Sequence, residues 1–404
     1  MNCHPVRAIT PGPFRTDLLL PGAGLPRILI VDDEPHALRI FSAFLSAAGM
    51  ETVTAASGEL ALELLDTGSF DTLLTDVRMP GLDGVALLQA ARKRDADLPV
   101  ILVTGCPAAD LSEDTMEIAP AGLLLKPVSG DLLVRTVART ARFCRLARFA
   151  HHRASAEPLP EPQLLQGPGV VPAFSRALSS LYLAWQPIVR STDGATYGHE
   201  AFVRTLEPTL ENPATFFGVA QDLDRLVDLG RAVRRTASSE IAGFPGETLF
   251  VNVHPSELHD DALSDPDSPL SALARSIVLE VSDRAPLKPG GAARARLQKL
   301  RRLGFRIAID DLGSGSTDPG TLAWLEPEFA KLDIPLVSGL DTDPAKQTRV
   351  HLLTKTLHEL GIAVVAEGIE TTGEREAAID LEVDFLQGFL FGRPKPVSAL
   401  LSPT

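Results

Sequence analysis

Short apolar segments alternate with helical segments along most of this chain, a pattern typical of parallel sheets covered by helices. One series of such segments starts at Arg27 and another near Ala177, and a proline-rich stretch lies between them. Repeated prolines cannot continue a helix, so this stretch is expected to be a linker. We therefore predict a loose leader at 1–25, a first α/β domain at 26–148, a linker at 149–175 and a second α/β domain at 176–400.

The first domain is predicted to be a doubly wound, flavodoxin-like sheet of five parallel strands. The strands are expected at Arg27–Val31, Thr52–Ala55, Thr72–Thr75, Pro99–Val103 and Gly122–Leu125. Helices are expected near Pro35–Ala48, Gly58–Thr67, Gly84–Lys93, Leu111–Ile118 and Ser129–Arg148. In an open sheet of this kind the functional site lies at the carboxyl ends of the strands.

Polar side chains follow several of these strands directly. Asp32 and Asp33 follow the first, Asp76 the third, Thr104 the fourth and Lys126 the fifth. Three carboxylates, a hydroxyl and an ammonium at one crevice suit Mg²⁺ beside a carboxylate that accepts a phosphoryl group. Lys126 and Thr104 would then stabilise the added charge. Taken singly, each residue has a structural explanation, because acidic runs cap helices and Lys-Pro is a common turn.

The second domain is predicted to be a TIM-like (β/α) barrel, because about eight strands with intervening helices fit into its length. The expected strands are Tyr182–Pro187, Gly198–Val203, Thr248–Val253, Ser276–Glu280, Arg306–Ile309, Phe329–Leu332, Ala363–Ala366 and Phe385–Gln387. The chemistry of such a barrel collects at the carboxyl ends of its strands.

Polar side chains, most of them possible oxygen ligands, recur at those ends: Glu200, Asn252, Glu280, Asp310, Asp311, Lys331, Asp333, Glu367, Glu370 and Gln387. Carboxylates accompanied by a carboxamide favour an octahedral oxygen site over zinc, which prefers His or Cys. Two such ions side by side are a standard device for cleaving a phosphodiester. Phosphodiester hydrolysis is therefore the reaction class that this set favours.

Structural explanations remain open for these residues too. An isolated Asp310-Asp311 pair is also typical of a solvated acidic turn, and Lys331 alone could be a solvated charge. Glu280 and Glu367 each follow an apolar strand, where an unpaired carboxylate would be costly to bury. A network of structural salt bridges is the principal alternative for the whole set.

Composition narrows the function classes. The formal net charge of −14 over 404 residues argues against an extended DNA footprint, although a local basic site for a small anion stays possible. Cys3, Cys106 and Cys144 are scattered without a CxxC pair, so neither a disulfide framework nor a zinc site is indicated. No apolar run is long enough to cross a membrane. We expect a cytoplasmic protein without membrane insertion.

Residues 26–148 resemble the response-regulator receiver domain. The motifs that carry the resemblance are Val31-Asp-Asp-Glu34, Thr75-Asp-Val-Arg-Met-Pro-Gly81, Val103-Thr-Gly105 and Leu125-Lys-Pro127. It implies phosphorylation of Asp76 by a sensor histidine kinase, one Mg²⁺ or Mn²⁺ held with the help of Asp32 and Asp33, and a switch through Thr104 and Lys126. Leu123 stands where that family usually has the aromatic residue that reports phosphorylation.

The second domain resembles the EAL-domain family of cyclic di-GMP phosphodiesterases. The matching motifs, in the family's order, are Trp185-Gln-Pro-Ile188, Glu200-Ala-Phe-Val-Arg204, Val251-Asn-Val253, Leu279-Glu-Val281, Ile309-Asp-Asp-Leu-Gly313, Ala330-Lys-Leu-Asp333, Ala366-Glu-Gly-Ile-Glu370 and Gln387-Gly-Phe-Leu-Phe391. The resemblance implies hydrolysis of cyclic di-GMP to linear pGpG with two Mg²⁺ or Mn²⁺ ions.

The same resemblance implies roles for single residues. The metal ligands would be Glu200, Asn252, Glu280 and Asp310 for one ion, with Asp311 and Asp333 completing the set. The catalytic residues would be Glu367, Lys331 and Glu200, of which Glu367 and Lys331 position and activate the attacking water. The dinucleotide would be held by Gln186, Arg204, Gln387 and Glu370.

Three positions depart from the EAL pattern. Phe202 replaces the leucine of the signature triplet, and the loop from Asp311 to Asp318 lacks the two aromatic residues usual there. Asp283 stands where the family commonly has a glutamate that anchors this loop. The ligands stay intact while their support is weakened, so low activity is expected, since misplacement by about 1 Å can cost a hundredfold.

The predicted function is therefore a response regulator that does not bind DNA and whose output domain hydrolyses cyclic di-GMP under control of Asp76 phosphorylation. The alternative is a catalytically weak or silent barrel that serves as a cyclic di-GMP receptor or a protein-docking module. Both domain types often pair with themselves, so a homodimer is expected.

Overall fold

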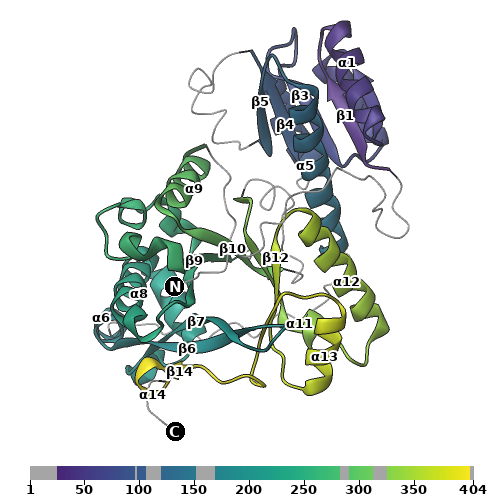
Figure 1. Cartoon of the computed structure of the whole chain (residues 1–404). Helices are drawn as coiled ribbons and strands as arrows, with labels where there is room; N and C mark the ends of the chain where they lie inside the picture. The colour runs from purple at the N-terminus through teal and green to yellow at the C-terminus, as the bar shows by residue number, and fades with distance from the viewer. Residues whose placement is uncertain are drawn as a thin grey trace.

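The structure is a computed structural model that describes residues 25–95, 98–105, 120–151, 169–282, 291–312 and 325–400. Two α/β domains are visible, an N-terminal sheet domain above and a barrel below (Figure 1). Among the described residues, no helix has both the length and the apolar character needed to span a membrane.

The N-terminal domain contains a parallel sheet in the order β2-β1-β3-β4-β5. Its strands are β1 (Arg27–Val31), β2 (Glu51–Ala55), β3 (Thr72–Asp76), β4 (Val100–Thr104) and β5 (Gly122–Leu125). All five strands are thus within a residue of the predicted bounds. The order turns back beside β1, and this places the carboxyl ends of β1 and β3 at a crevice.

Helices cover both faces of this sheet. They are α1 (Pro35–Ala47), α2 (Gly58–Thr67), α3 (Gly84–Arg94) and α5 (Gly130–His151). Alternate residues of the strands face two separate apolar clusters, one containing Leu29 and Leu102 and the other containing Ile28 and Ile101. The doubly wound fold is therefore confirmed. The helix predicted at Leu111–Ile118 lies outside the described residues.

The second domain is a closed barrel in which β13 also pairs with β6. Its strands are β6 (Leu181–Arg190), β7 (Thr196–Thr205), β8 (Thr248–Val253), β9 (Ile277–Ser282), β10 (Arg306–Leu312), β11 (Phe329–Leu332), β12 (Ala363–Ala366) and β13 (Phe385–Gln387), and a short β14 (Lys395–Pro396) pairs with β6 outside the ring. The predicted barrel is confirmed.

One strand runs opposite to the rest. β6 is antiparallel to both neighbours, β7 and β13, whereas the other pairs around the ring are parallel. The physical reason is a tight connection between β6 and β7, in which Gly194 adopts a φ of +70°. A parallel pair needs a crossover of a dozen or more residues, and the chain offers too few here.

Helices surround the barrel at α6 (Val170–Ser179), α7 (Pro213–Asp222), α8 (Leu226–Glu240), α9 (Gly291–Leu303), α11 (Ile334–Val337), α12 (Pro344–Glu359), α13 (Thr372–Asp380) and α14 (Val397–Leu400). The linker predicted at 149–175 therefore overlaps helix at both ends, because α5 extends to His151 and α6 begins at Val170. Phe174 and Ala177 of α6 are buried in the barrel core, and this burial offsets the helix-breaking composition around them.

Aromatic side chains fill the barrel at the amino ends of its strands. The Tyr197 and Phe385 ring centroids lie 4.3 Å apart, and those of Phe250 and Phe329 lie 5.3 Å apart. Arg306 donates from Nη1 to the Tyr197 hydroxyl at 2.7 Å. This end is a packed core, so the carboxyl ends of the strands are left for the functional site.

The two domains contact each other through α5 and α12, which lie side by side (Figure 1). Arg142 Nη1 lies 3.8 Å from Glu359 Oε2 at the end of α12, and Arg139 Nη1 lies 3.4 Å from Glu326 Oε1, just before β11. Ala121, which precedes β5, packs into the apolar cluster of the barrel. The N-terminal domain is therefore docked on the barrel.

A histidine–aspartate pair ties α12 to the strands that follow it. His358 Nε2 lies 2.8 Å from Asp384 Oδ2, and that oxygen also accepts from the Val364 N–H at 2.8 Å. The hydrogen bond to Asp384 raises the pKa of His358 against the opposing effect of burial.

A raised pKa means that the imidazolium stabilises the fold fully below about pH 6.5 and that this contribution is lost as pH rises through the folded-state pKa. We expect His358→Gln to reduce the free energy of unfolding by about 1 kcal/mol or less at pH 6, and by less at pH 9. Urea denaturation at the two pH values measures this difference. A loss that grows with pH would contradict the assignment.

Candidate functional site

A cavity of about 700 Å³ opens at the carboxyl ends of the barrel strands. Its acidic lining residues are Glu200, Asp310, Asp311, Glu367, Glu370 and Glu374, and its basic ones are Arg204 and Arg393. Six carboxylates against two guanidinium groups give the cavity a net negative wall. Such a wall repels a phosphate unless cations are held there.

Lys331 lies at the centre of the acidic residues and is fully buried. Its Nζ is 2.6 Å from Glu367 Oε1, 2.8 Å from Glu200 Oε2, 2.9 Å from Glu280 Oε1 and 3.7 Å from Asp310 Oδ1. Burial alone would lower the pKa of Lys331, but the four carboxylates outweigh it and raise that pKa well above its usual value. The interpretation of Lys331 as a solvated charge is therefore wrong.

Glu280 is the residue of this site whose surroundings most clearly suit a divalent cation. Its side chain is fully buried, and neither carboxylate oxygen has a hydrogen bond of acceptable geometry, although Lys331 lies close by. Burial, and then the charge of Glu200, raise the pKa of Glu280 well above its usual value. A divalent ion would satisfy these oxygens, so the donor set fits Mg²⁺ or Mn²⁺.

Asp310 and Asp311 lie at the end of β10, which continues past Ile309 and shifts its register there. Asp311 adopts a φ of +63°, a left-handed conformation rare for a residue with a side chain, and its N–H donates to Asp310 Oδ1 at 2.9 Å. Carboxylate oxygens of Asp310, Asp311 and Glu367 lie within 4.8 Å of one another. The twin aspartates thus form a second group able to hold an ion.

Glu200 connects the two sides of the barrel interior. Its Oε1 accepts from Asn252 Nδ2 at 3.0 Å, and its Oε2 accepts from Gln387 Nε2 at 2.6 Å. Burial would raise the pKa of Glu200, but the charge of Lys331 and these hydrogen bonds outweigh it and lower that pKa. Glu200 is therefore ionised and able to bind a metal.

Glu367 follows β12 and begins a loop. Glu374, which was not predicted as a site residue, holds this loop in place. Glu374 accepts hydrogen bonds from the N–H groups of Gly339, Glu370 and Thr371 at 2.8–3.1 Å. These bonds lower the pKa of Glu374 although its burial opposes them. The signal was available, because Thr371-x-x-Glu374 is a capping box before a helix.

The residues predicted to hold substrate also lie at the cavity. Gln186, Arg204, Glu370 and Gln387 all line it, and Gln387 Nε2 donates to Gln186 Oε1 at 3.1 Å. The cavity is also lined by Ile334, Phe389 and Arg393, for which no substrate contact was predicted. Arg393 lies over the Phe389 ring, 4.0 Å from its centroid, at the exposed edge of the cavity.

Asp333 is buried and directly precedes α11. Like Asn252 and Glu280, it is not among the residues that line the cavity. Its assignment as a metal ligand therefore stays a prediction.

The site predicted in the N-terminal domain assembles at the carboxyl ends of β1, β3 and β5. Oxygens of Asp32, Asp33 and Asp76 lie within 4.8 Å of one another, and Lys126 Nζ is 3.0 Å from Asp32 Oδ2 and 2.7 Å from Asp76 Oδ2. Burial would lower the pKa of Lys126, but its hydrogen bonds to Asp76 and Asp32 raise it. Thr104 ends β4 and is buried.

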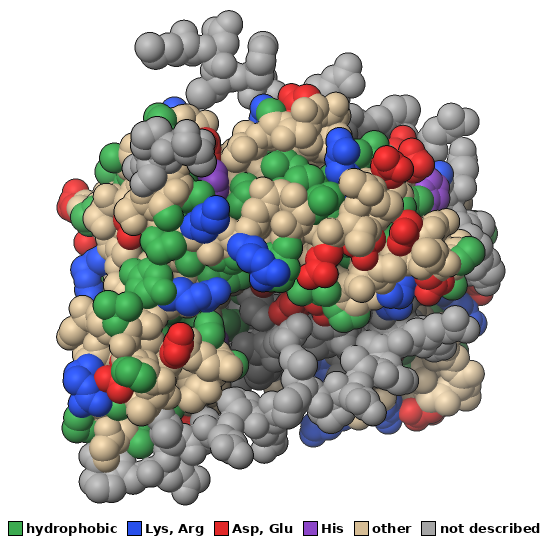
Figure 2. Space-filling model, turned by 90° about the horizontal axis from the view of Figure 1, so that it is seen from below, with side chains coloured by type: hydrophobic (Ala, Val, Ile, Leu, Met, Phe, Trp, Pro, Cys, Tyr) green, Lys and Arg blue, Asp and Glu red, His purple; other side chains and the backbone are tan. Residues whose placement is uncertain are grey.

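On the face of the molecule in Figure 2, Lys and Arg side chains are interspersed with acidic and apolar ones, and a hollow lies near the middle. The basic side chains drawn there are not gathered in a stripe.

Comparisons with known proteins find a matching domain family for each half of the chain. A model of the EAL domain matches residues 172–394, and a model of the response regulator receiver domain matches residues 28–138. The cyclic di-GMP phosphodiesterase RocR of Pseudomonas aeruginosa is 28% identical over 393 residues, which cover 91% of this chain and 96% of RocR.

An uncharacterized protein of Azorhizobium caulinodans is 30% identical over 294 residues, and these cover 68% of this chain but 40% of that relative. The chain thus spans less than half of that relative's length. Among solved structures, a MucR phosphodiesterase in complex with c-di-GMP is 25% identical with a TM-score of 0.51, covering 57% of this chain and 99% of that one. An EAL domain protein from Listeria monocytogenes shares the fold at 24% identity, with a TM-score of 0.52 over 58% of this chain and 96% of that one.

Proposed function

This chain belongs to the EAL-domain family and carries a receiver domain before its barrel, and we propose that it hydrolyses cyclic di-GMP to linear pGpG under control of phosphorylation at Asp76. The observation that carries the proposal is the acidic cavity around Lys331, with Glu280 lacking hydrogen bonds on both buried oxygens. Lys331 is the only cation that lies close to this carboxylate among the described residues, whereas a purely structural network would be expected to give both buried oxygens well-aligned donors.

Two Mg²⁺ or Mn²⁺ ions fit the donor set of the barrel, and one more fits the receiver. Glu200, Asn252, Glu280 and Asp310 would hold the first barrel ion, and Asp311 would hold the second. When bound, such ions neutralise phosphate charge and make water more acidic. The receiver ion would lie with Asp32, Asp33 and Asp76.

The side chains of the cavity then have separate tasks. Glu367 is placed to orient the attacking water and accept its proton, and its contact with Lys331 at 2.6 Å fixes it there. Burial and the charge of Asp310 raise the pKa of Glu367 despite Lys331, so its carboxylate is more basic than an exposed one, as suits a proton acceptor. Arg204 and Gln186 are placed to hold the dinucleotide, together with Gln387 and Glu370.

The test is the formation of pGpG from cyclic di-GMP, followed by chromatography with Mg²⁺ or Mn²⁺ and after removal of metal by EDTA. We expect turnover that depends on the metal and is lost in Glu200→Ala. Glu211→Ala, at an exposed position outside the cavity, serves as the matched control. No turnover with either ion, phosphorylated or not, would contradict the proposal, and binding without turnover would instead support a cyclic di-GMP receptor.

The contact between the domains supports control by the receiver. Asp76 is hydrogen-bonded to Lys126, which lies four residues before the start of α5. α5 in turn contacts Glu359 at the end of α12 and Glu326 before β11. α12 leads into β12 and Glu367, and β11 carries Lys331. A structural change at Asp76 can thus reach Glu367 and Lys331 through a few contacts.

This route gives a prediction for the response to beryllofluoride, a phosphoryl mimic. The hydrolysis rate of the wild type should change when it is added, and Asp76→Ala should not respond. Reversing both partly buried charges with Arg139→Glu and Arg142→Glu should reduce the response by up to about fivefold, because such pairs contribute up to about 1 kcal/mol. Adding Glu326→Arg and Glu359→Arg should restore part of it. An undiminished response in the Arg139→Glu, Arg142→Glu double variant would exclude this route.

A further inference from the structure

A buried ion pair lies behind the strand end that carries Asn252. Glu257 belongs to the 3-10 turn Pro255–His259 after β8, and Arg234 lies on α8; both side chains are almost fully buried. Neither residue lines the cavity. Contact with a substrate therefore does not explain this pair. A contribution to stability is also a weak explanation, because a buried ion pair often adds little net stability.

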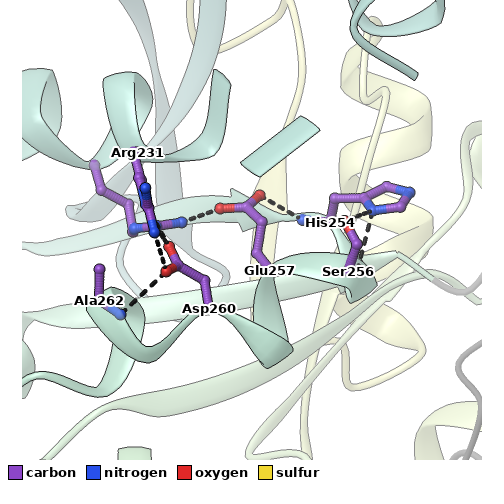
Figure 3. A network of polar contacts seen from close by, with 7 residues as sticks. Arg231, His254, Ser256, Glu257, Asp260 and Ala262 are labelled. Atoms are coloured by element: carbon purple, nitrogen blue, oxygen red, sulfur yellow. Dashed lines mark hydrogen bonds and ion pairs between the residues drawn. The ribbon is translucent and has the colours of Figure 1, made fainter. Parts of the chain in front are cut away.

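The two oxygens of Glu257 have different partners (Figure 3). Oε1 accepts a hydrogen bond from the backbone N–H of His254 at 2.9 Å, and Oε2 accepts one from Arg234 Nη1. His254 follows Asn252 by two residues. The carboxylate of Glu257 thus fixes the direction in which the chain leaves β8, directly beyond the proposed metal ligand.

Arg234 is held in turn by Asp260. Arg234 Nη2 donates to Asp260 Oδ2 at 2.7 Å, and the same carboxylate accepts two bonds from Arg231 and one from the Ala262 N–H (Figure 3). Asp260 is 7% exposed. Because Arg234 has a carboxylate on each side, its guanidinium cannot move away from Glu257 without breaking a second buried contact.

Gly230 shows that α8 is shaped to admit Glu257. A Cβ at Gly230 would lie 1.7 Å from Glu257 Oε2, far inside contact distance. Glycine in the middle of a helix costs about 1 kcal/mol relative to alanine. Glycine at position 230 therefore lowers the stability of α8 locally but leaves room for the Glu257 carboxylate.

Metal binding by Asn252 is sensitive to small displacements of its side chain. Its Nδ2 donates to Glu200 Oε1 at 3.0 Å, which leaves its carboxamide oxygen to coordinate an ion. We propose that Glu257 and Arg234 are positioning residues that hold Asn252 in the geometry required for divalent metal binding. This inference rests on the metal site of the proposed function. A network outside the cavity would thus fix the position of one metal ligand, Asn252.

The experiment is a titration of the full chain with Mn²⁺, with free Mn²⁺ measured by electron paramagnetic resonance. The binding that Glu200→Ala removes is assigned to the barrel, which separates it from the receiver site. Glu257→Gln should weaken the barrel binding about tenfold, in the range seen when an outer partner of a metal ligand is lost. His254→Pro removes the donated N–H, is compatible with the φ of −70° there, and should have a similar effect. It also removes the imidazole that contacts Ser256, so His254→Ala, which loses the imidazole but keeps the N–H, is its control and should leave Mn²⁺ affinity unchanged.

The decisive comparison uses Asn252→Ala. If Glu257 acts through Asn252, adding Glu257→Gln to Asn252→Ala should change Mn²⁺ affinity by less than about twofold. Glu328→Gln is the matched control, because Glu328 also accepts from a backbone N–H, that of Ile307 at 2.8 Å, and from an arginine. It lies at the amino end of β11 and should leave Mn²⁺ affinity unchanged.

Unchanged Mn²⁺ affinity in Glu257→Gln and His254→Pro would overturn the inference, as would an equal loss in the Asn252→Ala background. It would also be overturned if Glu200→Ala removed no Mn²⁺ binding. Wild type that binds Mn²⁺ in the barrel but does not hydrolyse cyclic di-GMP would contradict the proposed function alone. The two failures are therefore distinguishable.

Discussion

Glu367→Gln should lower kcat for cyclic di-GMP hydrolysis about a thousandfold at saturating Mn²⁺, in the range expected for loss of a general base. The amide has the same shape as the carboxylate and can still contact Lys331, which lies 2.6 Å away in the native chain. It cannot accept the proton of the attacking water. Nucleotide binding should change only a few-fold, because Gln186 and Arg204 are untouched.

Glu370→Gln is the matched comparison for this variant. Glu370 lines the same cavity three residues further along the same loop, and its N–H is likewise held by the loop's own hydrogen bonds. We expect this change to raise KM more than it lowers kcat. Steady-state rates and calorimetric binding separate the two effects. Retention of more than about a tenth of wild-type kcat by Glu367→Gln would exclude Glu367 as the proton acceptor.

Lys331→Met should make the stability of the barrel depend on divalent metal. The native ammonium contacts four carboxylates in a fully buried position. Removing it leaves those carboxylates without their cation, and breaking a buried ion pair in this way costs about 3–5 kcal/mol. Mn²⁺ should recover a large part of that loss, because it binds the folded chain and supplies the missing charge.

The sign of the pH dependence follows from the raised pKa values of Glu280 and Glu367. A carboxyl whose pKa is raised by folding destabilises the fold fully above its folded-state pKa and not at all below its unfolded-state value. The metal-free variant should therefore lose more stability at pH 8 than at pH 5. Urea unfolding with EDTA and with Mn²⁺ measures both effects.

Lys299→Met provides the control for this variant, because Lys299 is exposed on α9 and its loss should change the free energy of unfolding by less than about 0.5 kcal/mol. If Lys331→Met were as stable as wild type in EDTA, the carboxylates around it would have to be neutral already. That result would remove the main physical argument for a metal site.

The sequence predicted the fold well wherever a local pattern decides the structure. Strand bounds were predicted within a residue in the sheet domain, because continuous apolar runs mark buried parallel strands. The direction of β6 was missed because strand pairing depends on the connection rather than on the strand. A signal existed in Asp193-Gly194 between β6 and β7, since Asp-Gly between two strands is typical of a hairpin.

The site was predicted as a set of strand ends, and this explains both its success and its limits. Glu200, Asn252, Glu280 and Asp310 share a network around Lys331 because parallel strands bring their ends together. Glu367 and Asp333 both lie one residue past the end of a strand, and Glu367 lines the cavity. Where a residue just past a strand points depends on the following loop, which a strand pattern does not describe.

Residues that act through others were the hardest to predict. Glu257 and Glu374 both accept backbone N–H groups at the starts of short helices. Thr371-x-x-Glu374 fits the sequence pattern of a capping box, whereas His254-x-x-Glu257 does not. The capping pattern indicates a helix start and nothing about the residue beside it. Arg234 gave no signal, because its partners are 23 and 26 residues away along the chain.

The position of the docked receiver limits the kind of control it can exert. Its described ion pairs with the barrel involve Glu326 and Glu359, which precede β11 and β12, whereas the cavity opens at the opposite ends of these strands. Through these contacts the receiver cannot act as a lid that shuts the nucleotide out. Signalling would then adjust how fast bound nucleotide is cleaved, so the cell would obtain a graded change in output rather than a blocked entrance.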